Sequence, residues 1–182
     1  LWHHRPMRRL EAEAIRDALL AVSGRWDPEL YGPAIPPHRT AEDAAKRLFS
    51  GPLDGKGRRS VYVAMTLMEP PRFLALFNQP IPKLTTGHRD VTSVPDQALA
   101  LLNDPFVSAM AQYWSSSVLK DGAVSLEPRV RRMFATALGR PPTPEETARL
   151  VTLVRRMGGL RGSDEHLLLA CQPAWQDVAH AL

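Results

Sequence analysis

The sequence has a single cysteine, Cys171, and no Cys-x-x-Cys-His motif. One cysteine forms neither an internal disulfide nor a zinc site built from several cysteines. Without the motif, haem cannot be attached covalently in the manner of c-type cytochromes. Because proteins without disulfides occur in every compartment, the lone cysteine does not indicate where the protein works.

Histidines are few and poorly spaced for a metal site. None of the six lies four residues from another, the spacing that places two imidazoles on one helix face, and no His-Glu-x-x-His motif occurs. The segment GPLDGKGRR also lacks the spacing of a phosphate-binding loop. We therefore expect no metal and no cofactor in this chain.

Long apolar runs are absent as well, since no stretch approaches the about 18 residues that a membrane-spanning helix needs. The chain starts at Leu1 without a recognisable signal peptide, which favours a fragment of a larger protein. Only four of the 23 basic residues are lysines, and the net charge is +4. Because the arginines are scattered among acids, we do not expect nucleic acid to be the partner.

Local catalytic signatures are missing. Ser163, Asp164 and His166 are close in sequence, but a catalytic triad is assembled across a fold and has no such local pattern. A simpler interpretation is that Ser163 caps a helix. Cys171 follows three leucines and an alanine, which favours a small buried apolar residue over a reactive thiolate. The sequence identifies no catalytic residue.

What the chain does have is 17 prolines among 182 residues, of which 44% are hydrophobic. The prolines divide it into helices of moderate length. We therefore predict a mainly α fold: one irregular multi-helix domain over residues 1–182, with one short β-strand or hairpin and Pro-rich loops.

Helix signals recur along the chain. Gly24 and Gly139 are expected to end helices, Thr143 and Glu146 form a capping-box pattern, and Gly158-Gly159 is a second stop signal. The predicted helices cover 7–24, 40–49, a short stretch after Pro71, segments starting at Pro95 and Pro105, and 130–138, 144–157, 163–172 and 173–182.

One segment has the period of a strand. RSVYVAMT, residues 59–66, alternates apolar and polar or small side chains. A lone strand needs a partner for its backbone, and two alternatives stay open: the extended segment WDPELYGPAI, residues 26–35, or a segment outside this chain.

Helical periodicity also predicts which residues are buried. The expected members share inward-facing positions on their helices and should form one core. They are Leu10, Ile15, Leu19, Phe106, Met110, Trp114, Leu138, Leu150 and Val154.

The polar stretch from Thr85 to Val91, within LTTGHRDVTSVPDQALALLNDPF, precedes a helix that Thr92 or Ser93 should cap. Exposed helix N–H groups beside basic residues would suit a carboxylate, phosphate or sugar. The same side chains could instead satisfy one another and the backbone. We favour a bracing role for Arg89, bonded to backbone carbonyls or Asp90. The candidate ligand-binding residues are His88, Arg89, Asp90, Gln97 and Asn103.

Four segments together resemble a known family. They are RRLEAEAIRDALLAVSGR, RRSVYV, LTTGHRDVTSVPDQALALLNDPFV and ALGRPPTPEE, and their order is similar to that in the C-terminal domain of unknown function of large planctomycete proteins. Those proteins often also carry a planctomycete-type cytochrome c domain. The resemblance covers nearly the whole chain and implies a helical interaction or ligand-binding module of an extracytoplasmic or cell-envelope protein.

The resemblance further implies a cytochrome c domain as a partner within the parent protein and a carbohydrate or anion as ligand. An alternative is part of a polysaccharide-acting hydrolase or redox enzyme whose catalytic groups lie upstream. The chain departs from the family pattern in FNQPIP, where Asn78 and Ile81 replace two carboxylates. Any acid–base or cation-binding role of those carboxylates is thus in doubt here.

Overall fold

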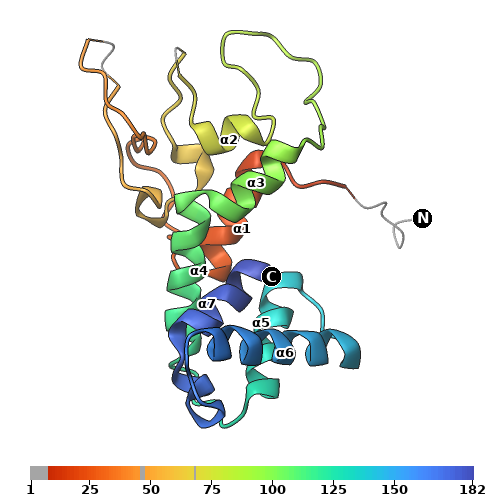
Figure 1. Cartoon of the computed structure of the whole chain (residues 1–182). Coiled ribbons are helices and arrows are strands. Elements are labelled where there is room, and N and C mark those ends of the chain that lie inside the picture. The colour runs from red at the N-terminus through yellow and green to blue at the C-terminus, as the bar shows by residue number, and fades with distance from the viewer. Residues whose placement is uncertain (1–7, 46–47, 68) are drawn as a thin grey trace. The chain divides into compact units, whose positions relative to one another are not determined.

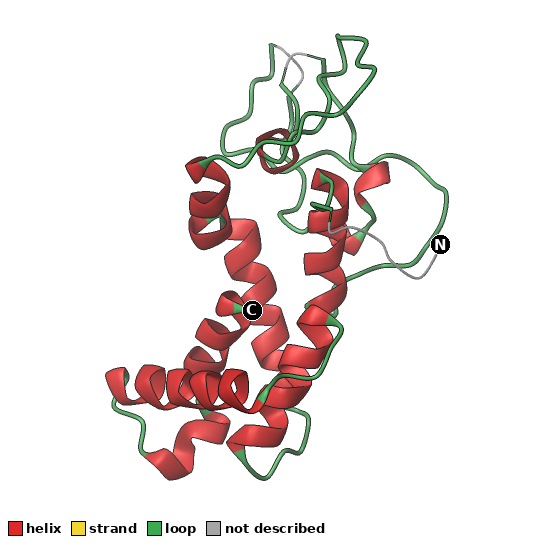
Figure 2. Cartoon of the chain, turned by 90° about the vertical axis from the view of Figure 1, so that its right-hand side faces the viewer, coloured by secondary structure: helices red, strands yellow, loops and turns green. Residues whose placement is uncertain are grey.

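The computed structural model describes residues 8–45, 48–67 and 69–182. This part of the chain is mainly helical and, as Figure 2 shows, it contains no strand beyond isolated bridges. The predicted mainly α fold is confirmed. The chain divides into two compact units: a loop unit that runs to Leu19 and resumes over Trp26–Leu101, and a helical unit of Leu20–Arg25 and Leu102–Leu182.

The loop unit contains few regular elements. It holds most of α1 (Ala12–Val22), the short helix α2 (Arg72–Leu76) and most of α3 (Pro95–Asn103). Two 3-10 turns, η1 (Gly55–Gly57) and η2 (Ser60–Tyr62), lie in the long connections that Figure 1 shows between α1 and α2. The apolar cluster of this unit is small: Ala12, Leu74 and Phe77, with Ile15, Phe73 and Leu76 packed against them.

Buried arginines hold the loops of this unit. Arg16, only 7% exposed, donates to the carbonyl oxygens of Arg58 at 2.9 Å and Asp54 at 2.8 Å. It also reaches the hydroxyl of Ser60 at 3.2 Å. A buried carbonyl without a partner is costly, and one guanidinium supplies five N–H donors. Arg16 thus ties α1 to the loop through η1 and η2.

The predicted strand at residues 59–66 is not formed. The carboxylate of Asp17 accepts hydrogen bonds from the backbone N–H of Ser60 at 2.8 Å and from its hydroxyl at 2.7 Å. These bonds hold the backbone in the 3-10 turn η2, which ends where the N–H of Val63 donates to the carbonyl of Ser60. Of the two alternatives for a partner, residues 26–35 do supply one, but only as two isolated parallel bridges, Asp27 to Arg58 and Ile35 to Val63.

The helix predicted for residues 40–49 is also wrong in the part that the structure describes; residues 46–47 lie outside it. Asp43 and Leu48 exchange two backbone hydrogen bonds of 3.0 and 2.9 Å as an antiparallel bridge. The carboxylate of Glu42 accepts from the N–H of Ser50 at 2.7 Å. Because Leu48 is buried, 4% exposed, its packing favours this bend over a helix.

The helical unit contains α4 (Pro105–Val118), α5 (Leu126–Leu138), α6 (Pro144–Leu160), the 3-10 segment η3 (Glu165–Ala170) and α7 (Gln172–Ala181). Helix α7 packs against α4 and α6, and α5 packs against α6 (Figure 1). Their shared apolar core consists of Ala111, Trp114, Val130, Met133, Val154, Leu168, Trp175, Val178 and Ala179.

A buried arginine also lies at the edge of this core. The guanidinium of Arg129 lies 4.9 Å from the ring centroid of Trp175 and 2.9 Å from the carboxylate of Asp121. The Trp175 indole N–H donates to the carbonyl of Leu168 at 2.8 Å. The buried guanidinium of Arg129 and the buried indole N–H of Trp175 therefore each have a polar partner.

Several predicted helix ends in this unit are confirmed. Helix α4 starts at Pro105 as predicted, with Asp104 as its cap, and Gly139 ends α5 in the left-handed conformation at φ 66°. Thr143 and Glu146 form the expected capping box. Gly158 does not stop α6, which continues to Leu160; a Cβ at Gly158 would lie 2.1 Å from the Leu168 side chain, so this glycine permits close packing. Ser163 caps no helix, because its hydroxyl lies 3.2 Å from the sulfur of Cys171.

The predicted single core is wrong in two respects. Among the described residues, the apolar cluster around Trp175 in the helical unit is separate from the cluster around Leu74 in the loop unit. Leu10 and Leu138 are 58% and 49% exposed, since Leu10 precedes α1 and the inner face of α5 is taken by Val130, Met133 and Phe134. Phe106, Met110, Trp114 and Val154 are buried as expected, and Leu150 packs against the core of the helical unit.

We predict that Arg16→Lys lowers the melting temperature of the chain by several degrees. A single ammonium cannot replace the two guanidinium nitrogens that reach the carbonyls of Asp54 and Arg58, and each buried carbonyl left without a donor costs about 1–3 kcal/mol. Calorimetry measures the shift. The control is Arg59→Lys, an exposed side chain with no partner among the described residues; equal melting temperatures for both variants would contradict the bracing role of Arg16.

A second prediction concerns pH. Two hydrogen bonds from Arg140 and one from the backbone of Thr143 lower the pKa of Glu146 to about 2, from 4.5. Because the folded-state pKa lies below the unfolded value, the stabilisation is complete above pH 4.5 and is lost as the pH falls toward about 2. In urea unfolding between pH 2 and 6, Glu146→Gln should therefore be less stable than the wild type at pH 6 and similar to it near pH 2. Glu145→Gln should show no such convergence.

Candidate functional site

The polar loop before α3 is braced by an ion pair with α1. Arg89 makes two parallel hydrogen bonds to Glu13, with Nη1–Oε2 and Nη2–Oε1 distances of 2.7 and 3.1 Å, and lies 3.3 Å from Glu11. A bidentate arginine–carboxylate pair fixes orientation as well as distance. Arg89 therefore braces the loop as predicted, but its partner is Glu13, and not Asp90 or a backbone carbonyl.

The pair shifts the titration of both groups. Partial burial acts to raise the pKa of Glu13, but the hydrogen bond from Arg89, a backbone hydrogen bond, the charge of Arg89 and a hydrogen bond from Gln79 together hold that pKa below its ordinary value. The pKa of Arg89 is raised in turn, chiefly by its hydrogen bond to Glu13. Arg89 therefore stays protonated. Its positive charge is largely neutralised within the protein, by Glu13 and Glu11.

Gln97 is a structural residue of the loop. It is 3% exposed, and its amide nitrogen donates to the carbonyl of Leu76 at 2.9 Å and to the side-chain oxygen of Asn78 at 3.1 Å. Arg9 donates to its amide oxygen and to the carbonyl of Thr92. Every polar group of the Gln97 side chain is therefore engaged before any ligand arrives.

Thr92, one of the two residues expected to cap α3, bonds elsewhere. The hydroxyl of Thr92 lies 2.9 Å from the side-chain oxygen of Asn78, so it joins the network around Gln97. Asn78 adopts a left-handed backbone at φ 64°, which asparagine tolerates better than most residues. The side-chain oxygen of Asn78 is the acceptor for both Thr92 and Gln97 here. Ile81 is 53% exposed.

A cleft of about 700 Å³ opens beside this loop, entirely within the loop unit. His88 and Asp90 lie on its rim together with Arg89, whereas Gln97 is buried behind it and Asn103 belongs to the helical unit, where it is exposed. The lining residues are Arg8, Arg9, Leu10, Glu11, Ala12, Phe77, Asn78, Gly87, His88, Arg89, Asp90 and Val91.

The charges of this cleft are not all neutralised internally. Arg89 is paired, and the guanidinium of Arg9 is used by Thr92 and Gln97. Within the described part of the chain, the side chains of Arg8, His88 and Asp90 have no partner, so two potential donors and one acceptor face the cleft. Sequence reasoning missed Arg8 and Arg9; their position just before α1 gave no sign that α1 begins beside the polar loop.

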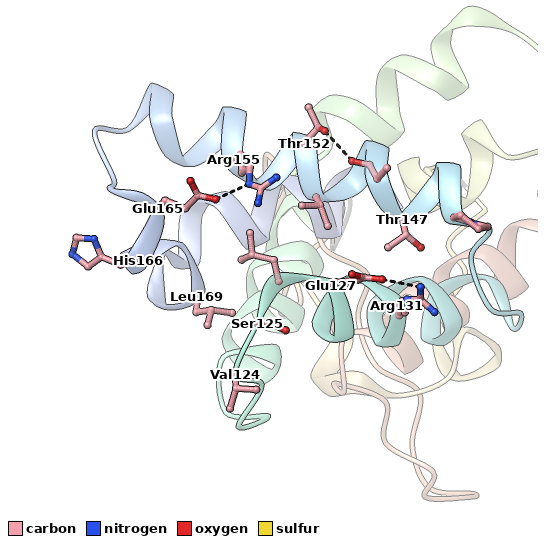
Figure 3. A pocket seen from close by; sticks show the side chains of 14 residues that line it. Val124, Ser125, Glu127, Arg131, Thr147, Thr152, Arg155, Glu165, His166 and Leu169 are labelled. Carbon is pink, nitrogen blue, oxygen red and sulfur yellow. Dashed lines mark hydrogen bonds and ion pairs between the residues drawn. The ribbon is translucent and has the colours of Figure 1, made fainter.

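A second hollow, of about 770 Å³, lies in the helical unit (Figure 3). Its charged residues neutralise each other: Arg131 pairs with Glu127 at 2.8 Å, and Arg155 with Glu165 at 2.9 Å. The ring of His166 points away from the other lining side chains. This hollow therefore offers a ligand less free charge than the cleft of the loop unit.

In residues 8–45, 48–67 and 69–182, no group of three or more His, Cys, Asp or Glu side chains is placed to hold a metal ion. No helix in the same part of the chain has the length and apolar character to cross a bilayer. The expected lack of a cofactor stays a prediction.

Comparison with known proteins identifies the class of protein. Residues 1–154 match the model of a family described as a protein of unknown function, DUF1553, so the chain belongs to that family. The match ends within α6. No curated protein and no solved structure matches the chain. The resemblance to a domain of unknown function is thus confirmed, whereas the association with cytochrome c stays a prediction.

We predict that Arg89→Ala lowers the melting temperature by a few degrees. It removes a bidentate pair worth about 1 kcal/mol, since a partly exposed pair is screened by water, and leaves Glu13 partly buried without its partner. Arg8→Ala, which removes from the same cleft an arginine with no partner in the part of the chain that the structure describes, should leave the melting temperature unchanged. Scanning calorimetry on both variants tests this, and an unchanged melting temperature for Arg89→Ala would show that the pair does not brace the loop.

Proposed function

We propose that this chain is a helical ligand-binding module of a larger extracytoplasmic or cell-envelope protein. Its ligand carries a carboxylate or phosphate beside hydroxyl groups, as an acidic sugar does. One observation carries the proposal: the cleft of the loop unit has a braced wall, and its side chains Arg8, His88 and Asp90 have no partner among the described residues.

The division of tasks among the arginines supports this function. Arg89 and Arg9 are used to hold the polar loop and α3. Arg8 is exposed and presents a planar fork of donors that suits a carboxylate or phosphate. Because the surrounding loop is already held in place, little conformational freedom has to be lost on binding.

The rest of the lining suits an amphipathic ligand. Leu10 and Val91, which are exposed, provide apolar surface, and the Asp90 carboxylate can accept hydrogen bonds from hydroxyl groups. A bare inorganic anion would use only the cationic part of the cleft. An acidic sugar would use both parts, because it carries an anionic group, hydroxyls and an apolar ring face.

The parent protein belongs to the same proposal. The family resemblance supports an extracytoplasmic location and a cytochrome c domain as the neighbouring partner in the parent chain. In this arrangement the module would hold a ligand or surface near the electron-transfer domain. Sequencing the parent gene beyond both ends of this chain tests the arrangement, and a parent without any export signal would contradict the location.

The binding test uses oligogalacturonate as an acidic probe, inorganic phosphate as a bare anion and maltohexaose as a neutral probe. We expect the wild-type chain to bind oligogalacturonate in calorimetric titration and Arg8→Ala to bind it at least tenfold more weakly, with an unchanged melting temperature. Arg149→Ala is the matched control, since Arg149 is an exposed arginine of α6 in the helical unit.

Two outcomes would count against the cleft. Equal weakening by Arg8→Ala and Arg149→Ala would mean that the acidic probe responds only to overall positive charge, an effect that rising salt should also abolish. No binding of oligogalacturonate by the wild-type chain would remove the acidic sugar from consideration.

A further inference from the structure

A chain of hydrogen bonds that begins at Arg9 fixes the orientation of the amide side chains beside the cleft of the loop unit. An arginine can only donate, so the amide oxygen of Gln97 must face it, and that oxygen also accepts from the N–H of Val94 at 3.4 Å. The amide nitrogen of Gln97 therefore faces the other way. It donates to the carbonyl of Leu76 at 2.9 Å and to the side chain of Asn78 at 3.1 Å.

Gln97 in turn determines how the amide of Asn78 is oriented. The atom of Asn78 that meets the Gln97 amide nitrogen must be its oxygen, because only an acceptor can pair with a donor. The same oxygen accepts from the hydroxyl of Thr92 at 2.9 Å. Both bonds use the oxygen, so the amide nitrogen of Asn78 is left without a partner among the described residues.

Asn78 also lies where a donor can meet a ligand. It is half-buried and lines the cleft of about 700 Å³ together with Arg8, His88 and Asp90. Its amide nitrogen carries two N–H groups and no charge. An anionic group is better matched by the charged fork of Arg8, so the neutral donor of Asn78 suits an uncharged oxygen, such as a hydroxyl or a ring oxygen.

The fold does not account for the amide nitrogen of Asn78. The residue ends α2 with a left-handed backbone at φ 64°, where its N–H donates to the carbonyl of Ala75 and the N–H of Gln79 donates to that of Leu74. This helix end needs a residue that tolerates positive φ, and the network around Gln97 needs an oxygen acceptor. Aspartate would meet both requirements and glycine the first. The nitrogen alone has no structural task.

We infer that Asn78 is a specificity residue of the cleft, whose amide nitrogen donates to an uncharged oxygen of the ligand while Arg8 meets its anionic group. This inference rests on the proposed function and adds a requirement to it: the ligand carries a hydroxyl or ring oxygen as well as a carboxylate or phosphate. A bare anion would not use Asn78. Because two bonds hold the Asn78 oxygen, the nitrogen is oriented before the ligand arrives, and little rotamer freedom is lost on binding.

Two substitutions remove the donor in different ways. Asn78→Asp keeps the oxygen acceptor and tolerates the left-handed backbone, but it exchanges the nitrogen for a charged oxygen. Asn78→Gly adds no charge and favours the same backbone, while Gln97 keeps its bond to the carbonyl of Leu76. Both variants should melt within a few degrees of the wild type. What they share is the loss of the amide nitrogen.

Binding of oligogalacturonate and of inorganic phosphate to the whole chain is measured by NMR titration. We expect both variants to bind oligogalacturonate about tenfold more weakly than the wild type, which is the effect of losing one hydrogen bond. Asn78→Gly should bind phosphate as the wild type does, whereas Arg8→Ala should weaken both ligands. For Asn78→Asp the loss should persist in high salt, because salt screens the repulsion by an added charge but does not restore a direct hydrogen bond.

The side-chain amide signals supply a readout that a structural role would not move. Oligogalacturonate should shift the Asn78 signal, which is assigned by its absence in Asn78→Gly. The Gln97 signal is the internal control and should shift less, since its oxygen and nitrogen are already engaged within the protein.

The outcomes separate this inference from the proposed function. If both Asn78 variants bind oligogalacturonate as the wild type does while Arg8→Ala binds it more weakly, the inference fails and the proposed function stands. If Asn78→Gly weakens phosphate as much as oligogalacturonate, Asn78 does not distinguish the two ligands and the inference fails as well. No binding of oligogalacturonate by the wild type would overturn the proposed function and this inference with it.

Discussion

Hydrogen bonds from buried arginines to backbone carbonyls are the interaction on which the loop unit depends. Its small apolar cluster around Leu74 and Phe77 cannot order long connections, because loops offer little apolar surface and many carbonyls. Arg16, Arg39 and Arg58 meet this need, each below 9% exposure and each bonded to at least one carbonyl. The abundance of arginine over lysine thus has a structural use, since an ammonium lacks the guanidinium's planar fork of donors.

Arginine side chains also hold the loops that carry the candidate ligand-binding residues. The polar loop beside the cleft is held by Arg89 on Glu13, and the Gln97 amide that orients Asn78 is held by Arg9. In each case the arginine that positions the loop is distinct from the side chains left free for a ligand. Free side chains on an unheld loop would lose more conformational entropy on binding, which would weaken the complex.

The sequence predicted the elements whose signals are local and missed those set by distant contacts. The starts of α4 and α6 follow from prolines and capping residues close in sequence, and the start of α3 follows from Pro95. The strand predicted at residues 59–66 failed because Asp17, more than forty positions away, bonds Ser60 and holds a turn. Arg89 was identified as a brace from its position in a polar loop, but its partner Glu13 was not, because 76 residues separate them. Arg8 was missed for the same reason.

Because distant residues hold the loops, a substitution at a buried residue could change the surface that the loop unit presents. The residues proposed to meet a ligand line the cleft, whereas the residues that position them are buried or paired and come from α1 or α3. A substitution at Gln97 would alter the orientation of Asn78 through the hydrogen bond to its oxygen, without changing any exposed side chain. Under the proposed function, ligand binding by this unit would depend both on the surface residues and on the arginines that hold them.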